Sequence, residues 1–135
     1  EEAYDKRLLT ILKEKEIDLI VLAGYLKIIS KEMIDEYPNQ IINIHPSLLP
    51  KYGGHGYYGL NVHKAVIENK ETKSGATVHY VDKGIDTGAI IMQESIDVLE
   101  DDTPNSLQKR ILEQVEHKLL VKAIQKIENS HGVIK

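Results

Sequence analysis

Apolar residues recur along the chain at two spacings, one typical of helices and one typical of buried strands. Between Tyr4 and Glu16 they stand three and four positions apart, which predicts a surface helix. From Asp18 to Ala23 the chain is short, rich in β-forming residues and apolar on both faces, as expected for a central parallel strand. Gly24 ends this predicted strand.

The middle of the chain predicts two helices around a second buried strand. Ser30 can cap a short helix that stops at Tyr37-Pro38, because the residue before a proline avoids helical backbone angles. Gln40 to His45 forms the predicted strand, which finishes on polar residues. A loop rich in proline and glycine follows, and Leu60 to Glu68 is predicted to be helical.

The last third of the chain predicts two strands and a long helix. Hydrophobic and polar residues alternate from Ala76 to Asp82 and from Ala89 to Val98, with a glycine-framed turn between them. Thr103 is a good N-cap and Pro104 a good first residue for a helix that reaches about Glu128. One face of this helix carries Leu107, Ile111, Val115, Leu119 and Ile124. The order of elements predicts an α/β fold whose parallel part leads into an antiparallel pair.

The composition is that of an ordinary globular domain. The 135 residues are 41% apolar and 28% charged, with a formal net charge of −4. The longest apolar run, 19–26, has eight residues, against the ~20 that a membrane span needs, so we expect no membrane partner. A slightly acidic chain without a basic stripe binds nucleic acid poorly. The lack of cysteine excludes disulfides, thiolate zinc sites and cysteine nucleophiles within this chain.

Candidate chemistry gathers at the end of the second strand. Asn43 and His45 stand two positions apart, so both side chains project from the same face of the strand. Ligands of open α/β sheets bind beyond the carboxyl ends of strands, where an amide and an imidazole suit electrophile activation and proton transfer. Asp86, between Gly84 and Gly88, can hold an imidazole in its charged form. From position alone, Asn43 and His45 equally suit a loop contact and a strand cap, and Asp86 an everyday turn.

The other polar candidates have plainer interpretations. His55, His63, His79 and His117 match no zinc-binding spacing, so we expect no metal. Tyr57 and Tyr58 suit stacking on a ring, or packing of their own loop. Glu113 and Glu116 on the last helix are by default solvated surface charges.

Several segments together resemble the folate-dependent formyltransferases, and among them most closely those that act on glycinamide ribonucleotide in purine synthesis. The motif from Asn43 to Pro50, NIHPSLLP, resembles the family signature. DLIVLAGYLKIIS, residues 18–30, looks like the family's strand and pteridine-binding loop. Residues 75–81 and 85–88 look like its folate-loop region, and the resemblance covers nearly all of the chain. It implies a Rossmann-like fold, with a mainly parallel central sheet, an antiparallel C-terminal pair and flanking helices.

The resemblance also implies a reaction and three catalytic residues. Asn43, His45 and Asp86 match the family's catalytic trio. In that family an amine attacks the formyl carbon of 10-formyltetrahydrofolate directly, without metal or covalent intermediate. Asn43 would donate a hydrogen bond to the developing oxyanion, and His45, as imidazolium, would stabilise it and act as general acid. Asp86 would raise the pKa of His45 and order a water that relays the proton.

Binding residues are implied in the same way, and the expected ligands are small molecules. The folate site would include the following positions: Leu22, Leu26, Lys27, Ile28, Ile29, Asp82, Lys83, Gly84 and Ile85. Glu113 and Glu116 match the stretch near the ribonucleotide, with Glu116 at the position that contacts the ribose hydroxyls. We expect a cytoplasmic monomer or homodimer.

Two departures from the family pattern set the remaining expectations. The family chain normally begins with a strand and a glycine-rich loop that holds the substrate phosphate, whereas this chain starts at Glu1. We therefore expect residues 1–135 to form a single domain that corresponds to the C-terminal two thirds of the family domain. The loop 51–60, KYGGHGYYGL, is longer than in typical members.

Two alternatives to the transferase stay open. One is the related formyltetrahydrofolate deformylase, a hydrolase whose signature usually carries a second histidine where this chain has Pro46. The other is an inactive piece that holds the folate half-site.

Overall fold

A computed structural model describes residues 11, 14–15, 19–23, 31–82 and 87–130 of the chain. The elements in it are β1 (Ile20–Ala23), α2 (Lys31–Glu36), β2 (Ile41–His45), α3 (Leu60–Glu68), β3 (Lys73–Tyr80), β4 (Ile90–Asp97), α4 (Pro104–Ile111), a π-helical turn η1 (Leu112–Glu116) and α5 (His117–Ser130). Ile11 and Glu14, within the predicted first helix, are helical, and most of that segment lies outside the described residues. Among the described residues no helix is both long and apolar enough to cross a membrane.

The strands form one sheet in the order β1-β2-β3-β4. β1 pairs with β2 in parallel, whereas β2 with β3 and β3 with β4 are antiparallel. This confirms an α/β fold in which a parallel part leads into an antiparallel pair. β1, predicted to be a central strand, forms the edge of the described sheet, and Val21 there is 38% exposed.

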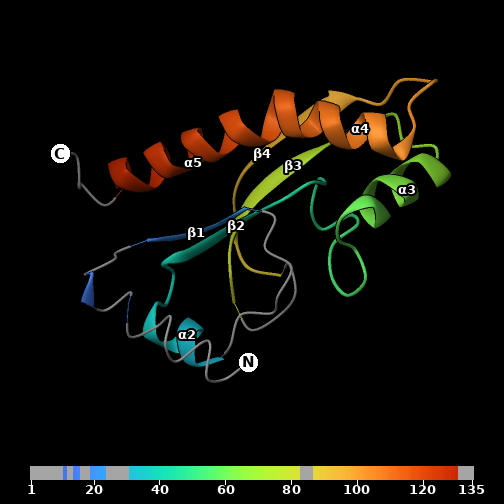
Figure 1. Ribbon diagram of the computed structural model, residues 1–135. Helices are drawn as coiled ribbons and strands as arrows, with labels where there is room; N and C mark the ends of the chain where they lie inside the picture. The colour runs from blue at the N-terminus through green and yellow to red at the C-terminus, as the bar shows by residue number, and fades with distance from the viewer. Residues whose placement is uncertain (1–10, 12–13, 16–18, 24–30, 83–86, 131–135) are drawn as a thin grey trace.

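The helices cover the two faces of the sheet unequally (Figure 1). The long α4–α5 unit runs along one face, and α2 lies on the other side. Even-numbered residues of β2 and β3, such as Ile42 and Val78, join the main core beneath α4–α5. Odd-numbered Ile41 packs instead with Met33 and Tyr37 of the α2 region. The odd-numbered positions of β2 and β3 therefore belong to the face that α4–α5 does not cover.

β3 starts three residues earlier than the alternation predicted and is buried on both faces from residue 74 to residue 79. Its polar start, Lys73-Ser74-Gly75, hides it from a hydrophobic pattern. Gly75 is required there, because a Cβ at this position would lie 2.0 Å from the carbonyl oxygen of Glu94 on β4.

The last helix begins as predicted but is not continuous. Six of its own residues, spaced four apart, are buried: Leu107, Ile111, Val115, Leu119, Ala123 and Ile127. In a regular α-helix each such step drifts by about 40°, so the stripe would wind around the helix. The π turn η1 adds a residue to one turn and offsets part of this drift. For the same reason Ala123 and Ile127 are buried, whereas the predicted Ile124 is only partly buried.

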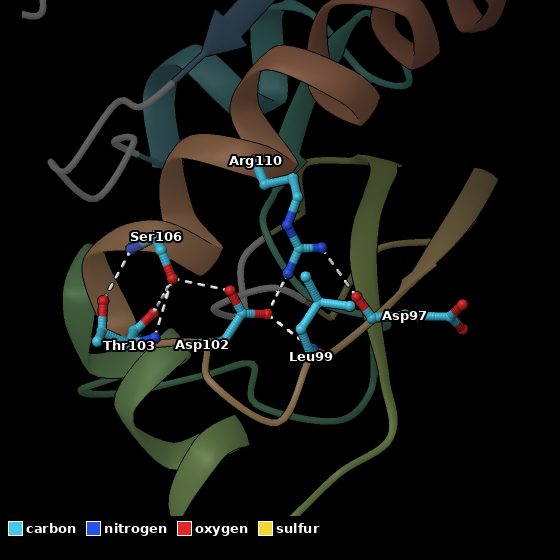
Figure 2. A network of polar contacts seen from close by, with 6 residues as sticks. All are labelled: Asp97, Leu99, Asp102, Thr103, Ser106 and Arg110. Carbon is cyan, nitrogen blue, oxygen red and sulfur yellow. Dashed lines mark hydrogen bonds and ion pairs between the residues drawn. The ribbon is translucent and has the colours of Figure 1, made fainter.

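A polar network fixes the start of α4 against the end of β4 (Figure 2). Thr103 and Ser106 form a reciprocal capping box. The Asp102 carboxylate accepts hydrogen bonds from the Leu99 amide (2.8 Å), the Ser106 hydroxyl (2.8 Å) and the Arg110 guanidinium. Arg110 also donates to the Asp97 carbonyl (2.9 Å). Burial alone would raise the pKa of Asp102, but these donors outweigh it and hold the pKa below its usual value.

Candidate active site

Asn43 and His45 lie on one face of β2, at its carboxyl end. Ile44, which stands between them, and Ile42, which precedes Asn43, point into the main core. The two polar side chains therefore project to the opposite face. His45 is 5% exposed, and Asn43 is partly buried. The shared face that the spacing predicted is therefore confirmed.

The His45 imidazole is held by the loop that follows β2. Its Nε2 lies 2.7 Å from the carbonyl oxygen of Tyr52. Because a carbonyl oxygen only accepts, Nε2 carries a hydrogen and donates it.

Thr77 fixes the first part of this loop from the neighbouring strand. It stands opposite His45 in the β2–β3 ladder. Its hydroxyl donates to the Ser47 carbonyl (2.7 Å) and accepts from the Leu49 amide (3.0 Å). Gln93 of β4 donates to the Leu49 carbonyl (2.7 Å). Buried hydrogen bonds from two strands thus hold the chain between His45 and Tyr52.

His79 is a site residue that the sequence interpretation missed. It pairs with Asn43 across β2 and β3, and its Nε2 lies 3.3 Å from the Asn43 side-chain nitrogen. It is 2% exposed. The period of the strand already placed it on one face, but only the antiparallel register brings it to Asn43.

A third buried histidine, His63 of α3, lies close enough for the charge of His45 to act on it. Burial, and secondarily that charge, lower the pKa of His63 to about 4. Its side chain is fully buried, and in the described part of the chain neither ring nitrogen has a hydrogen-bond partner. His63 is therefore neutral at physiological pH.

A hollow of about 230 Å³ lies behind the same loop, lined among others by Leu48, Tyr52 and Glu71. The Tyr52 hydroxyl donates to Glu71 (2.7 Å). Burial and this carboxylate raise the pKa of Tyr52 to about 12. Asn43 and His45 do not line the hollow.

Two of the predicted folate-site residues are described, Leu22 and Asp82, and Leu22 neighbours Asn43. Leu22 stands opposite Asn43 in the β1–β2 ladder and packs on the α2 side of the sheet. Asp82 is exposed and accepts a hydrogen bond from the Thr87 hydroxyl (2.8 Å), which joins the two ends of segment 83–86. The remaining predicted folate-site positions lie outside the described residues: Leu26, Lys27, Ile28, Ile29, Lys83, Gly84 and Ile85. Asp86, predicted to be catalytic, also lies outside them.

The two predicted substrate-binding glutamates lie on the π turn, which packs on β3 and β4. Glu113 is exposed. Glu116 is partly buried, and burial raises its pKa, against the opposing effect of His117. Within the described ranges, no three His, Asp or Glu side chains gather closely enough to hold a metal ion.

Comparison with known proteins decides the family. The family model for formyl transferase matches residues 1–124. The chain belongs to the formyl transferase family. A chloroplastic phosphoribosylglycinamide formyltransferase of Arabidopsis thaliana is 46% identical to this formyl transferase chain over 117 residues, 87% of the chain and 40% of the relative. The chain thus spans less than half of that curated relative.

Solved structures agree with this family assignment. The phosphoribosylglycinamide formyltransferase of Bacillus halodurans matches 94% of the chain with a TM-score of 0.83 and 40% identity, over 62% of its own length. A formyltetrahydrofolate deformylase of Pseudomonas syringae matches 88% of the chain with a TM-score of 0.77 and 28% identity, over 38% of its length. The predicted Rossmann-like formyltransferase fold is confirmed.

Proposed function

We propose that the Asn43–His45 face transfers a formyl group from 10-formyltetrahydrofolate to the amine of glycinamide ribonucleotide. The observation that carries this proposal is the pairing of an amide donor and a buried imidazole at the end of β2, in a chain of the formyl transferase family. Two relatives, 46% and 48% identical to the chain, are named phosphoribosylglycinamide formyltransferase. The structural neighbour named as a deformylase is less similar in sequence.

In the proposed reaction the two substrates react directly with each other, without a covalent enzyme intermediate. The amine nitrogen bonds to the formyl carbon, and the formyl oxygen becomes an oxyanion. Asn43 donates an N–H to that oxygen, and His45 in its charged form stabilises it. The bond from N10 of the folate to the formyl carbon then breaks, N10 takes a proton, and the amine loses one.

The hydrogen bonding of His45 assigns the proton that it exchanges. Nε2–H is committed to the Tyr52 carbonyl, which also fixes the ring orientation. The proton that His45 delivers is therefore the one on Nδ1. Asp86 is proposed to favour the charged imidazole and to order the relaying water.

The residues beside the site suit its proposed ligands. Leu22 offers an apolar side chain next to Asn43, as a pteridine ring requires. The Asp82–Thr87 hydrogen bond sets the base of the loop that would cover the folate. Glu116, on the π turn of the α4–α5 unit and not on the Asn43–His45 face, is proposed to accept hydrogen bonds from the ribose hydroxyls of the ribonucleotide, with Glu113 nearby on the same turn.

Compartment and assembly stay predictions. A cytoplasmic monomer or homodimer is expected from the sequence, whereas two plant relatives are named chloroplastic. The partners proposed are the two small-molecule substrates.

The proposal is tested on the full product of the gene, by following loss of the formyl donor with and without glycinamide ribonucleotide. We expect loss of the donor only when the ribonucleotide is present, with one formylated ribonucleotide per donor consumed. Release of formate at the same rate without ribonucleotide would identify a hydrolase instead. No loss of the donor by a folded protein would refute both activities.

A further inference from the structure

Asn43 and His79 face each other across the β2–β3 ladder. The two residues are direct register partners, and the Asn43 side-chain nitrogen lies 3.3 Å from His79 Nε2. Both side chains project to the face of the sheet that carries His45. A side-chain amide can present either its N–H groups or its oxygen to a ligand, so its neighbour decides which one is available.

The main chain determines which nitrogen of His79 accepts. His79 Nδ1 lies 2.9 Å from the carbonyl oxygen of Tyr80. That oxygen can only accept, so Nδ1 carries a hydrogen and donates it. The Asn43 Nδ2 group that faces Nε2 is itself a donor, so Nε2 is the nitrogen that accepts from it. An Asn43 amide rotated by half a turn would place its oxygen against this lone pair.

The fold itself holds His79 in this state. β3 is an inner strand of the sheet, and His79 is 2% exposed. The Tyr80 carbonyl is approached closely by Gly88, where a Cβ would lie 1.7 Å from that oxygen. The Tyr80 amide donates to the Ala89 carbonyl (2.9 Å), which fixes this part of the chain from its other side.

We propose that His79 is a positioning residue that sets the orientation of the Asn43 amide. It holds one Nδ2 hydrogen, which leaves the other for the formyl oxygen and turns the Asn43 oxygen away. This inference rests on the proposed role of Asn43 as donor to the oxyanion. Only the N–H side of the amide stabilises a negative oxygen, since the carbonyl side would repel it.

A pair of substitutions separates this role from mere filling of space. In His79→Gln the side-chain oxygen reaches the place of Nε2, whereas in His79→Asn the shorter side chain reaches only the place of Nδ1. We expect His79→Asn to lower kcat of the full gene product roughly tenfold, the effect of one hydrogen bond, with KM for the formyl donor little changed. His79→Gln should recover most of that loss. Equal losses in the two variants, or a change in KM alone, would overturn the proposal.

A double substitution tests whether His79 acts through Asn43. In an Asn43→Ala background, His79→Asn should cause no further loss of turnover, because the group that it positions is absent. Losses that multiply would show that His79 acts independently of Asn43, contrary to the proposal.

The tautomer can be measured on the unaltered protein, so the proposal does not depend on the folding of a variant. Nitrogen-15 NMR of the imidazole rings should show His79 protonated on Nδ1 and bare on Nε2, coupled to an Asn43 amide hydrogen. The opposite tautomer would overturn the proposal. If this tautomer is found but no formyl group is transferred to the ribonucleotide, the proposed function fails and the amide orientation stands.

Discussion

Among the described residues three histidines are buried, and their surroundings give them different behaviour. His45 and His79 each donate to a main-chain carbonyl, which fixes the ring and its tautomer. His63 has no such partner within the described residues, and its pKa falls to about 4. A polar group that is buried without a hydrogen-bond partner lowers the stability of the folded state. For His63 this cost is larger for the protonated ring than for the neutral ring.

The first prediction concerns pH. The folded-state pKa of His63, about 4, lies below the unfolded value near 6.5, so the unfolded chain binds the proton first as pH falls. The free energy of unfolding should therefore drop as pH falls from about 6.5 towards 4, by about 1.4 kcal/mol per unit from this residue. Urea unfolding at pH 7, 6 and 5 measures it.

His63→Leu removes the titrating group and should flatten this pH dependence, whereas His55→Leu at an exposed position should leave it unchanged. A His63→Leu protein with the same slope as the unaltered protein would show that His63 does not carry the effect.

The second prediction concerns turnover. Asn43→Ala should lower kcat by roughly 10²- to 10³-fold, the usual loss for one oxyanion donor. His45→Ala should lower it by roughly 10²- to 10⁴-fold, the usual general acid–base contribution. Steady-state kinetics of the full gene product measures both. His55→Ala serves as the control, and turnover unaffected in His45→Ala would remove the assigned role.

At the scale of elements, polar contacts of a few residues determine where the α4–α5 unit begins and how it is held against β4. The capping box starts α4 at Pro104, and Arg110 in its last turn pairs with Asp102 and donates to the Asp97 carbonyl at the end of β4. The sequence alone predicts this start, because Thr103-Pro104 is a specific signal. The π turn is not predictable in that way, since apolar residues four apart fit a regular helix over any short stretch.

The third prediction tests this anchor. Asp102 is partly buried, with its side chain 4% exposed, and accepts three hydrogen bonds, so Asp102→Asn should lower the free energy of unfolding by about 1.5–3 kcal/mol. Asp101→Asn makes the same charge change at an exposed neighbour and should cost less than about 0.5 kcal/mol. Because the pKa of Asp102 is lowered, its contribution is present above the unfolded pKa, about 3.9, and is lost as pH falls through the lowered folded value. Equal costs for the two variants at neutral pH would contradict the account.

The fourth prediction concerns the π turn. Deletion of the exposed Gln114 should convert η1 into regular α-helix and keep the buried stripe on both sides. Thermal stability should change little, but Glu116 is re-aimed, so KM for the ribonucleotide should rise. Deletion of Lys122 in regular helix should instead rotate Ala123 and Ile127 out of the core and lower the melting temperature. If deletion of Gln114 and deletion of Lys122 lower the melting temperature equally, η1 does not contain an extra residue that the helix can lose.

At the scale of the molecule, the sheet separates stability from chemistry. Its even-numbered β2 and β3 residues pack beneath α4–α5, and its odd-numbered ones gather Asn43, His45 and His79 on the opposite face. Strand period alone predicts the grouping of Asn43 with His45. It does not predict His79, because the pairing of strands about thirty residues apart is set by tertiary packing.

The central claim is that this face moves a formyl group directly to an amine. A single turnover with a donor labelled with carbon-13 in the formyl group, followed by NMR on the full gene product, tests it most directly. The account predicts that the label passes from the folate to the amide of the ribonucleotide at the rate at which the donor disappears. Label that appears first on the protein, or as free formate, would contradict it.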